Sequence, residues 1–216
     1  MHAKSDPPTS PVHPKSNRRV FLAGLLAGGA CGSAATWGIS RWRDREPSDR
    51  EADPNDLPEA KLPDLDHSRY MRLAIEEAAK VPHLPFGALI VHRDSRKVLA
   101  RGHNRTAASP TFHGEIDVIN RLAAKQAGID WAPLVLYTTA EPCPMCHAAV
   151  CWAGIGVVVF GSSIPFLKEL GWWQIDIRAE EVARRTPFRR TAILGGVLEA
   201  ECNRLFLNAP KRLPRK

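Results

Sequence analysis

The 216-residue sequence has few cysteines, no internal repeat and no excess of charge over most of its length. Five cysteines are too few to hold a chain of this size together by disulfides, which excludes a disulfide scaffold. No repeat of useful period occurs, so nothing indicates a repeat architecture. What is present suits one globular domain with extensions, because 44% of the residues are hydrophobic and 25% are charged.

The formal net charge of +7 lies at the two ends of the chain. The first 40 residues carry a net charge of +3 and the basic tail 210–216 carries +4, which leaves residues 41–210 neutral. A neutral body has no strong, uniform field for a polyanion. Nucleic acid is therefore an improbable partner on charge alone.

Residues 1–40 have the layout of an export signal. Arg18 and Arg19 precede a Gly/Ala-rich apolar run from Val20 to Ile39, and they resemble the twin-arginine signal of bacteria. The alternative is a membrane anchor, because the run is just long enough to span a bilayer. We expect a periplasmic protein that contacts the membrane only through this segment, if the segment is uncleaved. The charged, proline-bearing residues 41–66 are predicted to be a linker.

Apolar residues between positions 67 and 209 recur with the spacings of helices and of strands in alternation. Helical spacing predicts long helices over residues 67–80, 113–127, 143–153 and 199–207, with shorter pieces near 166–170 and 177–185. Short apolar runs predict strands over residues 86–91, 97–101, 134–138, 156–160 and 192–197.

The order of these elements predicts the fold class. Strands 86–91 and 97–101 are joined by a short turn, which predicts an antiparallel hairpin. Strand 134–138, helix 143–153 and strand 156–160 follow one another at once, which predicts a parallel crossover. The sequence therefore predicts an α/β protein with a mixed central sheet flanked by helices, in three α/β/α layers over residues 67–209.

Two short motifs carry residues that suit a catalytic metal. One is His113-Gly-Glu115 and the other is Pro142-Cys143-Pro-Met-Cys146. Zinc in catalytic sites takes three protein ligands, and one imidazole with two thiolates supplies them. A cysteine pair at i and i+3 that opens a helix brings both sulfurs to its N-terminus, which favours thiolates. We predict one Zn²⁺ held by His113, Cys143 and Cys146, with Glu115 as a nearby carboxylate that does not bind the metal.

Each motif alone has simpler explanations. A Cys-x-x-Cys pair also occurs in structural zinc sites and in redox pairs. Structural zinc normally takes four protein ligands, and the remaining candidates fit badly. Cys151 lies five residues beyond Cys146, and Cys202 falls in the last predicted helix. Together the two motifs favour catalytic zinc over a structural zinc or a redox pair.

Residues 67–209 resemble the cytidine and deoxycytidylate deaminase superfamily, nearest its guanine deaminases and tRNA adenosine deaminases. The resemblance rests on five stretches, residues 85–91, 102–104, 110–115, 136–146 and 157–161. It implies a deaminase domain over residues 67–209 that assembles as a homodimer. It also implies that Glu115 moves protons, that Asn104 hydrogen-bonds the substrate, and that Phe86 and Trp152 are pocket aromatics. From the residues alone, Phe86 and Trp152 could equally be core aromatics and Asn104 a turn residue.

Two positions depart from the family pattern. Gly114 stands where the family usually has alanine, and the loop after Gly161 has no acidic residue where guanine deaminases place one. The resemblance implies hydrolytic replacement of an amino group by a carbonyl, with release of ammonia. We expect a free nucleobase or nucleoside as substrate, with a guanine-like purine favoured and a pyrimidine as the lesser option. One alternative is a tRNA adenosine deaminase, although export from the cytoplasm would separate such an enzyme from its tRNA. The other alternative is a non-catalytic zinc-stabilised binding module.

Overall fold

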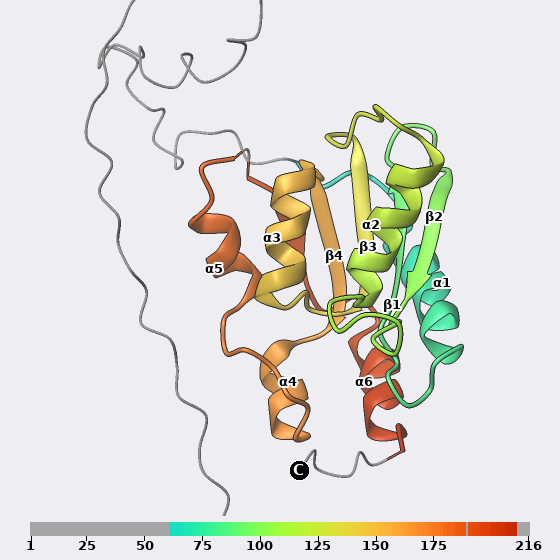
Figure 1. Cartoon of the computed structure of the whole chain (residues 1–216), viewed down its shortest axis with the longest axis vertical. Coiled ribbons are helices and arrows are strands. Elements are labelled where there is room, and N and C mark those ends of the chain that lie inside the picture. Colours follow the sequence, from blue (N-terminus) through green and yellow to red (C-terminus); the bar gives the residue numbers. More distant parts are fainter. Residues whose placement is uncertain (1–60, 189, 211–216) are drawn as a thin grey trace, which may run out of the picture. The chain divides into compact units, whose positions relative to one another are not determined.

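The computed structural model describes residues 61–188 and 190–210 (Figure 1). The predicted signal or anchor in residues 1–40, most of the predicted linker and the charged residues of the basic tail lie outside these described residues. Residues 61–66 form neither helix nor strand. Within the described part of the chain, no helix is long and apolar enough to cross a membrane.

A five-stranded sheet runs through the centre of the domain. Its strands are β1 (Gly87–His92), β2 (Val98–His103), β3 (Leu134–Ala140), β4 (Val157–Ser162) and β5 (Ala192–Leu194), in the spatial order β2-β1-β3-β4-β5. Strand β1 pairs antiparallel with β2 and β3, whereas β3, β4 and β5 are mutually parallel. The predicted mixed sheet, hairpin and parallel crossover are therefore confirmed.

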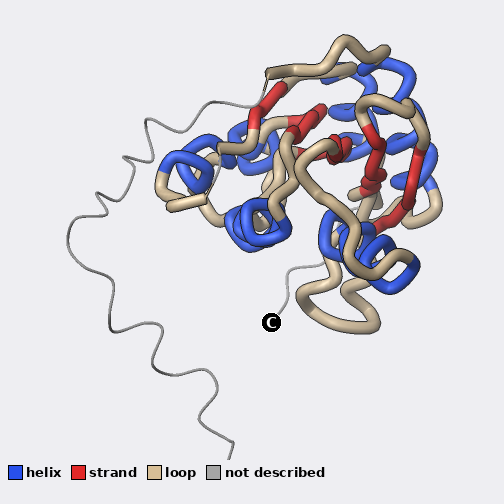
Figure 2. The backbone as a smooth tube through the Cα atoms, turned by 90° about the horizontal axis from the view of Figure 1, so that it is seen from above, coloured by secondary structure: helices blue, strands red, loops and turns tan. Residues whose placement is uncertain are grey.

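The described residues form six helices, namely α1 (His67–Ala79), α2 (Gly114–Lys125), α3 (Pro144–Ala153), α4 (Ile164–Glu169), α5 (Ala179–Arg184) and α6 (Glu199–Leu207). Helices α1 and α6 pack on one face of the sheet and α2 and α3 on the other, whereas α5 packs against α3. In Figure 1, α2 and α3 lie in front of the sheet. Figure 2 gives the same domain from above, with the strands between the helices. This arrangement confirms the three-layer α/β/α class.

Alternation along the strands produces the two cores. Leu89 and Val91 point to the face covered by α1 and α6, and they pack with Met71 and Tyr137. Ala88, Ile90, Leu134, Leu136 and Val158 point to the opposite face and pack with Val118 and Leu122 of α2 and Val150 of α3. Successive side chains of a strand point to opposite faces, so each apolar strand contributes to both cores.

The later elements differ slightly from the predicted ranges. Helix α4 begins at Ile164, two residues earlier than predicted, because Ser163 caps it by accepting a hydrogen bond from the Phe166 N–H at 3.3 Å. Strand β5 ends at Leu194 and not at residue 197. Gly196 has φ +78°, which no regular strand adopts, so the strand cannot continue to residue 197.

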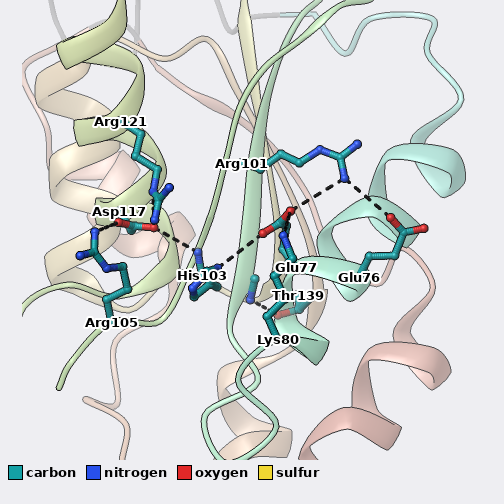
Figure 3. Close-up of polar contacts among 10 residues, drawn as sticks. Glu76, Glu77, Lys80, Arg101, His103, Arg105, Asp117, Arg121 and Thr139 are labelled. Carbon is teal, nitrogen blue, oxygen red and sulfur yellow. Dashed lines mark hydrogen bonds and ion pairs between the residues drawn. The ribbon is translucent and has the colours of Figure 1, made fainter. Parts of the chain in front are cut away.

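Two buried carboxylates join α1, β2 and α2 (Figure 3). Glu77 of α1 lies 3.5 Å from Nδ1 of His103 on β2. Asp117 of α2 accepts hydrogen bonds from Arg105 Nη1 at 3.1 Å, from Arg121 Nε at 2.7 Å and from the His103 N–H at 3.3 Å. This polar cluster fixes the end of β2 against the first turn of α2.

Candidate metal centre and substrate pocket

Two helix N-termini meet at the carboxyl end of β3. His113 is the N-cap residue of α2 and Cys143 is the N-cap residue of α3, both with extended backbone (ψ 164° in each). Cys146 lies in the first turn of α3, and Pro144 opens that helix without losing a hydrogen bond. The spacing of Cys143 and Cys146 therefore turns both sulfurs toward the start of α2.

The three predicted ligands are close enough to share one cation. Cys143 Sγ lies 3.6 Å from His113 Nδ1 and 3.6 Å from Cys146 Sγ, and all three ligand atoms lie within 4.8 Å of one another. Tetrahedral zinc with bonds of about 2.3 Å to sulfur and about 2.0 Å to nitrogen places its ligand atoms roughly 3.5 to 3.8 Å apart. The observed separations and the Cys₂His donor set fit zinc, and His113, Cys143 and Cys146 are the residues that would hold it.

The electrostatics of Cys143 also favour metal binding. The hydrogen bond to Cys146 lowers the pKa of the Cys143 thiol to about 4, with a further contribution from His113. The same hydrogen bond between Cys143 and Cys146 raises the pKa of the Cys146 thiol well above its usual range. Cys143 is therefore a thiolate at neutral pH, and the thiolate is the form of cysteine that binds metals.

Glu115 lies beside the ligand group and is itself almost fully buried, at 3% exposure. Its Oε1 accepts a hydrogen bond from Thr138 Oγ1 at 3.1 Å, which fixes the carboxyl group relative to β3. Burial raises the pKa of Glu115, and the nearby Cys143 adds to that rise. A carboxyl group in this position can exchange a proton with a molecule bound next to the metal ligands.

A pocket of about 270 Å³ opens over the ligand group. It is lined by Leu84, Phe86, Asn104, Thr106, Pro110, His113, Glu115, Glu141, Cys143, Trp172, Trp173 and Gln174. The structure therefore brings predicted residues Phe86 and Asn104 together with Glu115 and two metal ligands. Asn104 Oδ1 accepts from both the N–H and the hydroxyl of Thr106, at 3.1 Å and 2.8 Å. No hydrogen bond joins Asn104 Nδ2 to a described residue, so its amide N–H groups are available to a ligand.

Trp152 is not among the residues that line this pocket. Its side chain is 77% exposed, and its ring centroid lies 4.7 Å from that of Phe188. It lines a second cavity of about 650 Å³ between α3 and α5. The structure therefore does not bring Trp152 together with the metal ligands of its own chain, because Trp152 lies on the side of α3 that faces α5.

The other described cysteines take no part in the ligand group. Cys151 and Cys202 are buried and free, and neither belongs to the metal-binding cluster of the described residues. Burial raises the pKa of Cys202 to about 12, with smaller contributions from Glu201 and Glu199. A buried thiol of that kind behaves as a small apolar side chain.

Sequence reasoning missed one wall of the pocket, which consists of Trp172, Trp173 and Gln174. These residues follow Gly171, whose φ of +82° accompanies the end of α4, and they belong to no helix or strand. A segment without periodicity carries no sequence pattern that predicts its position. The two adjacent tryptophans were the only available indication of a binding surface.

Comparisons with known proteins agree with this site. Residues 65–162 match the cytidine and deoxycytidylate deaminase zinc-binding region. The guanine deaminase of Bacillus subtilis (strain 168) is 28% identical, over 67% of this chain and 97% of the relative. The tRNA-specific adenosine deaminase of the same strain is 32% identical, over 68% of this chain and 90% of the relative.

A solved structure described as NE0047 in complex with 2,6-diaminopurine superposes with a TM-score of 0.59 and 26% identity, over 69% of this chain and 85% of that one. The zinc-binding region of the family contains all three ligand positions found in the structure. The chain thus belongs to the cytidine and deoxycytidylate deaminase family, with one Zn²⁺ as its cofactor.

Proposed function

We propose that the protein is a hydrolytic deaminase of a free nucleobase or nucleoside, with a guanine-like purine as the favoured substrate. The observation that carries the proposal is the juxtaposition of a Cys₂His ligand group and a buried carboxyl group, Glu115, at the base of one small pocket. The reaction takes up one water, replaces a ring amino group by a carbonyl and releases ammonia.

The size and charge of the pocket support a small, uncharged substrate. Its volume of about 270 Å³ lies just below the range of about 300–1,000 Å³ that is usual for drug-sized ligands. None of the described residues that line it is a lysine or an arginine, so no strong partner for a phosphate group is present. A planar base, alone or with its sugar, suits such a pocket better than a nucleotide does.

In the proposed mechanism, bound zinc supplies a Lewis acid that lowers the pKa of water. Glu115 takes a proton from the water that adds to the reacting carbon and delivers it to the ring nitrogen next to that carbon. It then takes a second proton from the hydroxyl group now on that carbon and gives it to the departing amine, which leaves as ammonia while the carbonyl forms. Thr138 holds Glu115 Oε1 and so orients the carboxyl group. Asn104 Nδ2 donates to an acceptor on the ring, and Phe86 forms part of the apolar wall that excludes bulk water.

Two of the comparisons support a purine. One relative is a guanine deaminase, and the NE0047 structure contains 2,6-diaminopurine. The tRNA-specific adenosine deaminase has a similar identity, so a nucleic-acid substrate is the second candidate. It requires salt-sensitive RNA binding, and the neutral residues 41–210 do not favour that. The periplasmic location, the export signal at Arg18 and Arg19 and the homodimer stay predictions.

The proposal is tested by measuring ammonia released from a panel of bases, nucleosides and nucleotides by the zinc-loaded full chain. Glu115→Gln should keep one zinc per chain and lose at least about 10²-fold in turnover, because proton transfer by a positioned side chain contributes about 10²–10⁴-fold. Glu76→Gln, at a carboxylate that is 63% exposed on α1, is the matched control. Undiminished turnover in Glu115→Gln would exclude the proton-transfer role of Glu115. If the zinc-loaded parent chain released no ammonia from any compound of the panel, the proposed deaminase activity would be excluded.

A further inference from the structure

A second carboxylate, Glu141, lines the pocket beside Cys143 and has no role in the mechanism above. Glu141 is only 3% exposed. Oε1 accepts from the Ala179 N–H at 2.9 Å and from Arg178 Nε at 2.7 Å. Oε2 accepts from the Ile164 N–H at 2.9 Å and from Arg178 Nε at 2.8 Å. Both oxygens are thus engaged by protein donors, so Glu141 is not a second proton carrier for the substrate.

These contacts hold the two ends of one segment of the chain, residues 164–179. Ile164 is the first residue of α4, and Ala179 is the first residue of α5. Their N–H groups have no partner within their own helices, and the Glu141 carboxylate accepts from both. Since Glu141 directly follows β3, it joins the start of α4 and the start of α5 to the loop that carries the metal ligand Cys143.

Segment 164–179 contains Trp172, Trp173 and Gln174, the pocket wall that the sequence did not predict. Trp172 packs edge-on against Phe86, with ring centroids 5.6 Å apart, and against Phe206, with centroids 5.4 Å apart. Trp173 is 72% exposed, and the Gln174 side chain forms no hydrogen bond with a described residue. The wall therefore offers a ligand two indole rings and one neutral amide. That combination suits the face and the edge of a planar, uncharged heterocycle.

Only one end of this wall is held by its own packing. Trp172 is fixed by its two aromatic neighbours and by its backbone N–H, which donates a hydrogen bond to the Leu167 carbonyl oxygen at 2.9 Å. Beyond Trp173, Asp176 forms an ion pair with Lys168 of α4, but these side chains are 72% and 38% exposed, and such exposed pairs contribute little to stability. The attachment to a buried group is that of Arg178, whose side chain is 42% exposed and which meets the buried carboxylate of Glu141. Charge-assisted hydrogen bonds are about twice as strong as neutral ones, so this contact dominates the far end.

We propose that Arg178 is a positioning residue for substrate specificity, which acts through Glu141 by holding Trp173 and Gln174 against the pocket. This inference rests on the proposed function, because it concerns which substrates the same site accepts. Arg178 itself does not line the pocket, so its effect on a substrate is indirect. Its loss should therefore affect substrate binding more than the proton transfers at Glu115.

The test compares three zinc-loaded variants of the full chain, Arg178→Met, Arg178→Lys and Arg185→Met. Arg185 is the matched control, since it forms a 2.8 Å ion pair with Glu181 on α5 but is 73% exposed. Hydrogen exchange of residues 170–178 is measured first and needs no substrate. Arg178→Met should accelerate exchange in this segment about tenfold and leave α2 unchanged, Arg178→Lys should recover part of the protection, and Arg185→Met should match the parent chain.

Steady-state kinetics on the best substrate of the panel give the second readout. Arg178→Met should raise KM at least fivefold and change kcat less than twofold, with partial recovery in Arg178→Lys. Unchanged exchange in Arg178→Met overturns the positioning role whether or not the panel shows turnover, so the two proposals fail separately. Faster exchange with an unchanged KM also overturns the proposal, because the wall would then move without affecting the substrate.

Discussion

Gly87 provides a quantitative test of how closely α1 packs on the sheet. It is the first residue of β1 and follows Phe86, which lines the pocket. A Cβ atom at Gly87 would lie 2.2 Å from the carbonyl oxygen of Ala74 and 2.4 Å from the backbone nitrogen of Ala78. Both atoms belong to the backbone of α1, so no change of rotamer can relieve the contact. Only a movement of the helix or of the strand can admit the methyl group.

The expected loss of stability follows from that movement. Contacts of Cβ closer than 3.0 Å essentially never occur, so α1 and β1 must separate by about 0.8 Å at this point. Ala74 and Ala78 are fully buried there, and the shift would reduce their packing. Overpacking a core typically costs about 1–3 kcal/mol. We expect Gly87→Ala to lie at the upper end, near 3 kcal/mol, which corresponds to a fall of roughly 6–12 °C in melting temperature.

The assay is urea unfolding of the full chain at a fixed, saturating zinc concentration, because bound metal contributes to the apparent stability. The control is Gly128→Ala, at a site with φ +72° where an added Cβ meets no atom within 4 Å. It should cost only about 1 kcal/mol, through backbone strain alone. Equal stabilities of the two variants, or a Gly87→Ala chain within 0.5 kcal/mol of the parent, would refute the close approach of α1.

Further variants test the metal centre and the polar cluster of Figure 3. Cys143→Ser should lower both the zinc content and the melting temperature, since a ligand that binds only the folded chain stabilises it, whereas Cys151→Ala should keep one zinc per chain. Elemental analysis and thermal melts check both, and full zinc content in Cys143→Ser would contradict the ligand assignment. Asp117→Asn should cost about 1–3 kcal/mol in urea unfolding, because it weakens the bonds to Arg105 and Arg121. These arginines are partly exposed and can be rehydrated, so a loss well above 3 kcal/mol would show that the cluster does more than join β2 to α2.

Much of the fold could be predicted because its patterns are local. The apolar run of β3 and the stop of α3 at Gly154, with φ +79°, are visible within a few residues of sequence. The motif His113-Gly-Glu115 and the cysteine pair likewise belong to two helix starts. For these residues, chain neighbours and secondary structure settle where the side chain points.

The missed parts depend on contacts between distant segments. The outward position of Trp152, at 77% exposure, is one such feature, because α3 turns its other side to the sheet; its role as a pocket aromatic stays a prediction. Glu141 appears in the sequence only as the residue before Pro142. Its two oxygens find their partners 23 to 38 residues further along the chain.

The sequence by itself determined the order of helices and strands and the two motifs that supply the zinc ligands and the acidic group, because each motif lies within a single helix start. The meeting of these two helix starts depends on the assembled sheet. Only the tertiary structure decided which aromatic rings enclose the pocket, and that the Glu141 carboxylate is engaged by Arg178 and two helix N-termini. The physical reason is that an irregular segment such as residues 171–178 has no periodicity of its own. Its position is set by long-range packing and hydrogen bonds that exist only once the sheet and its helices have assembled.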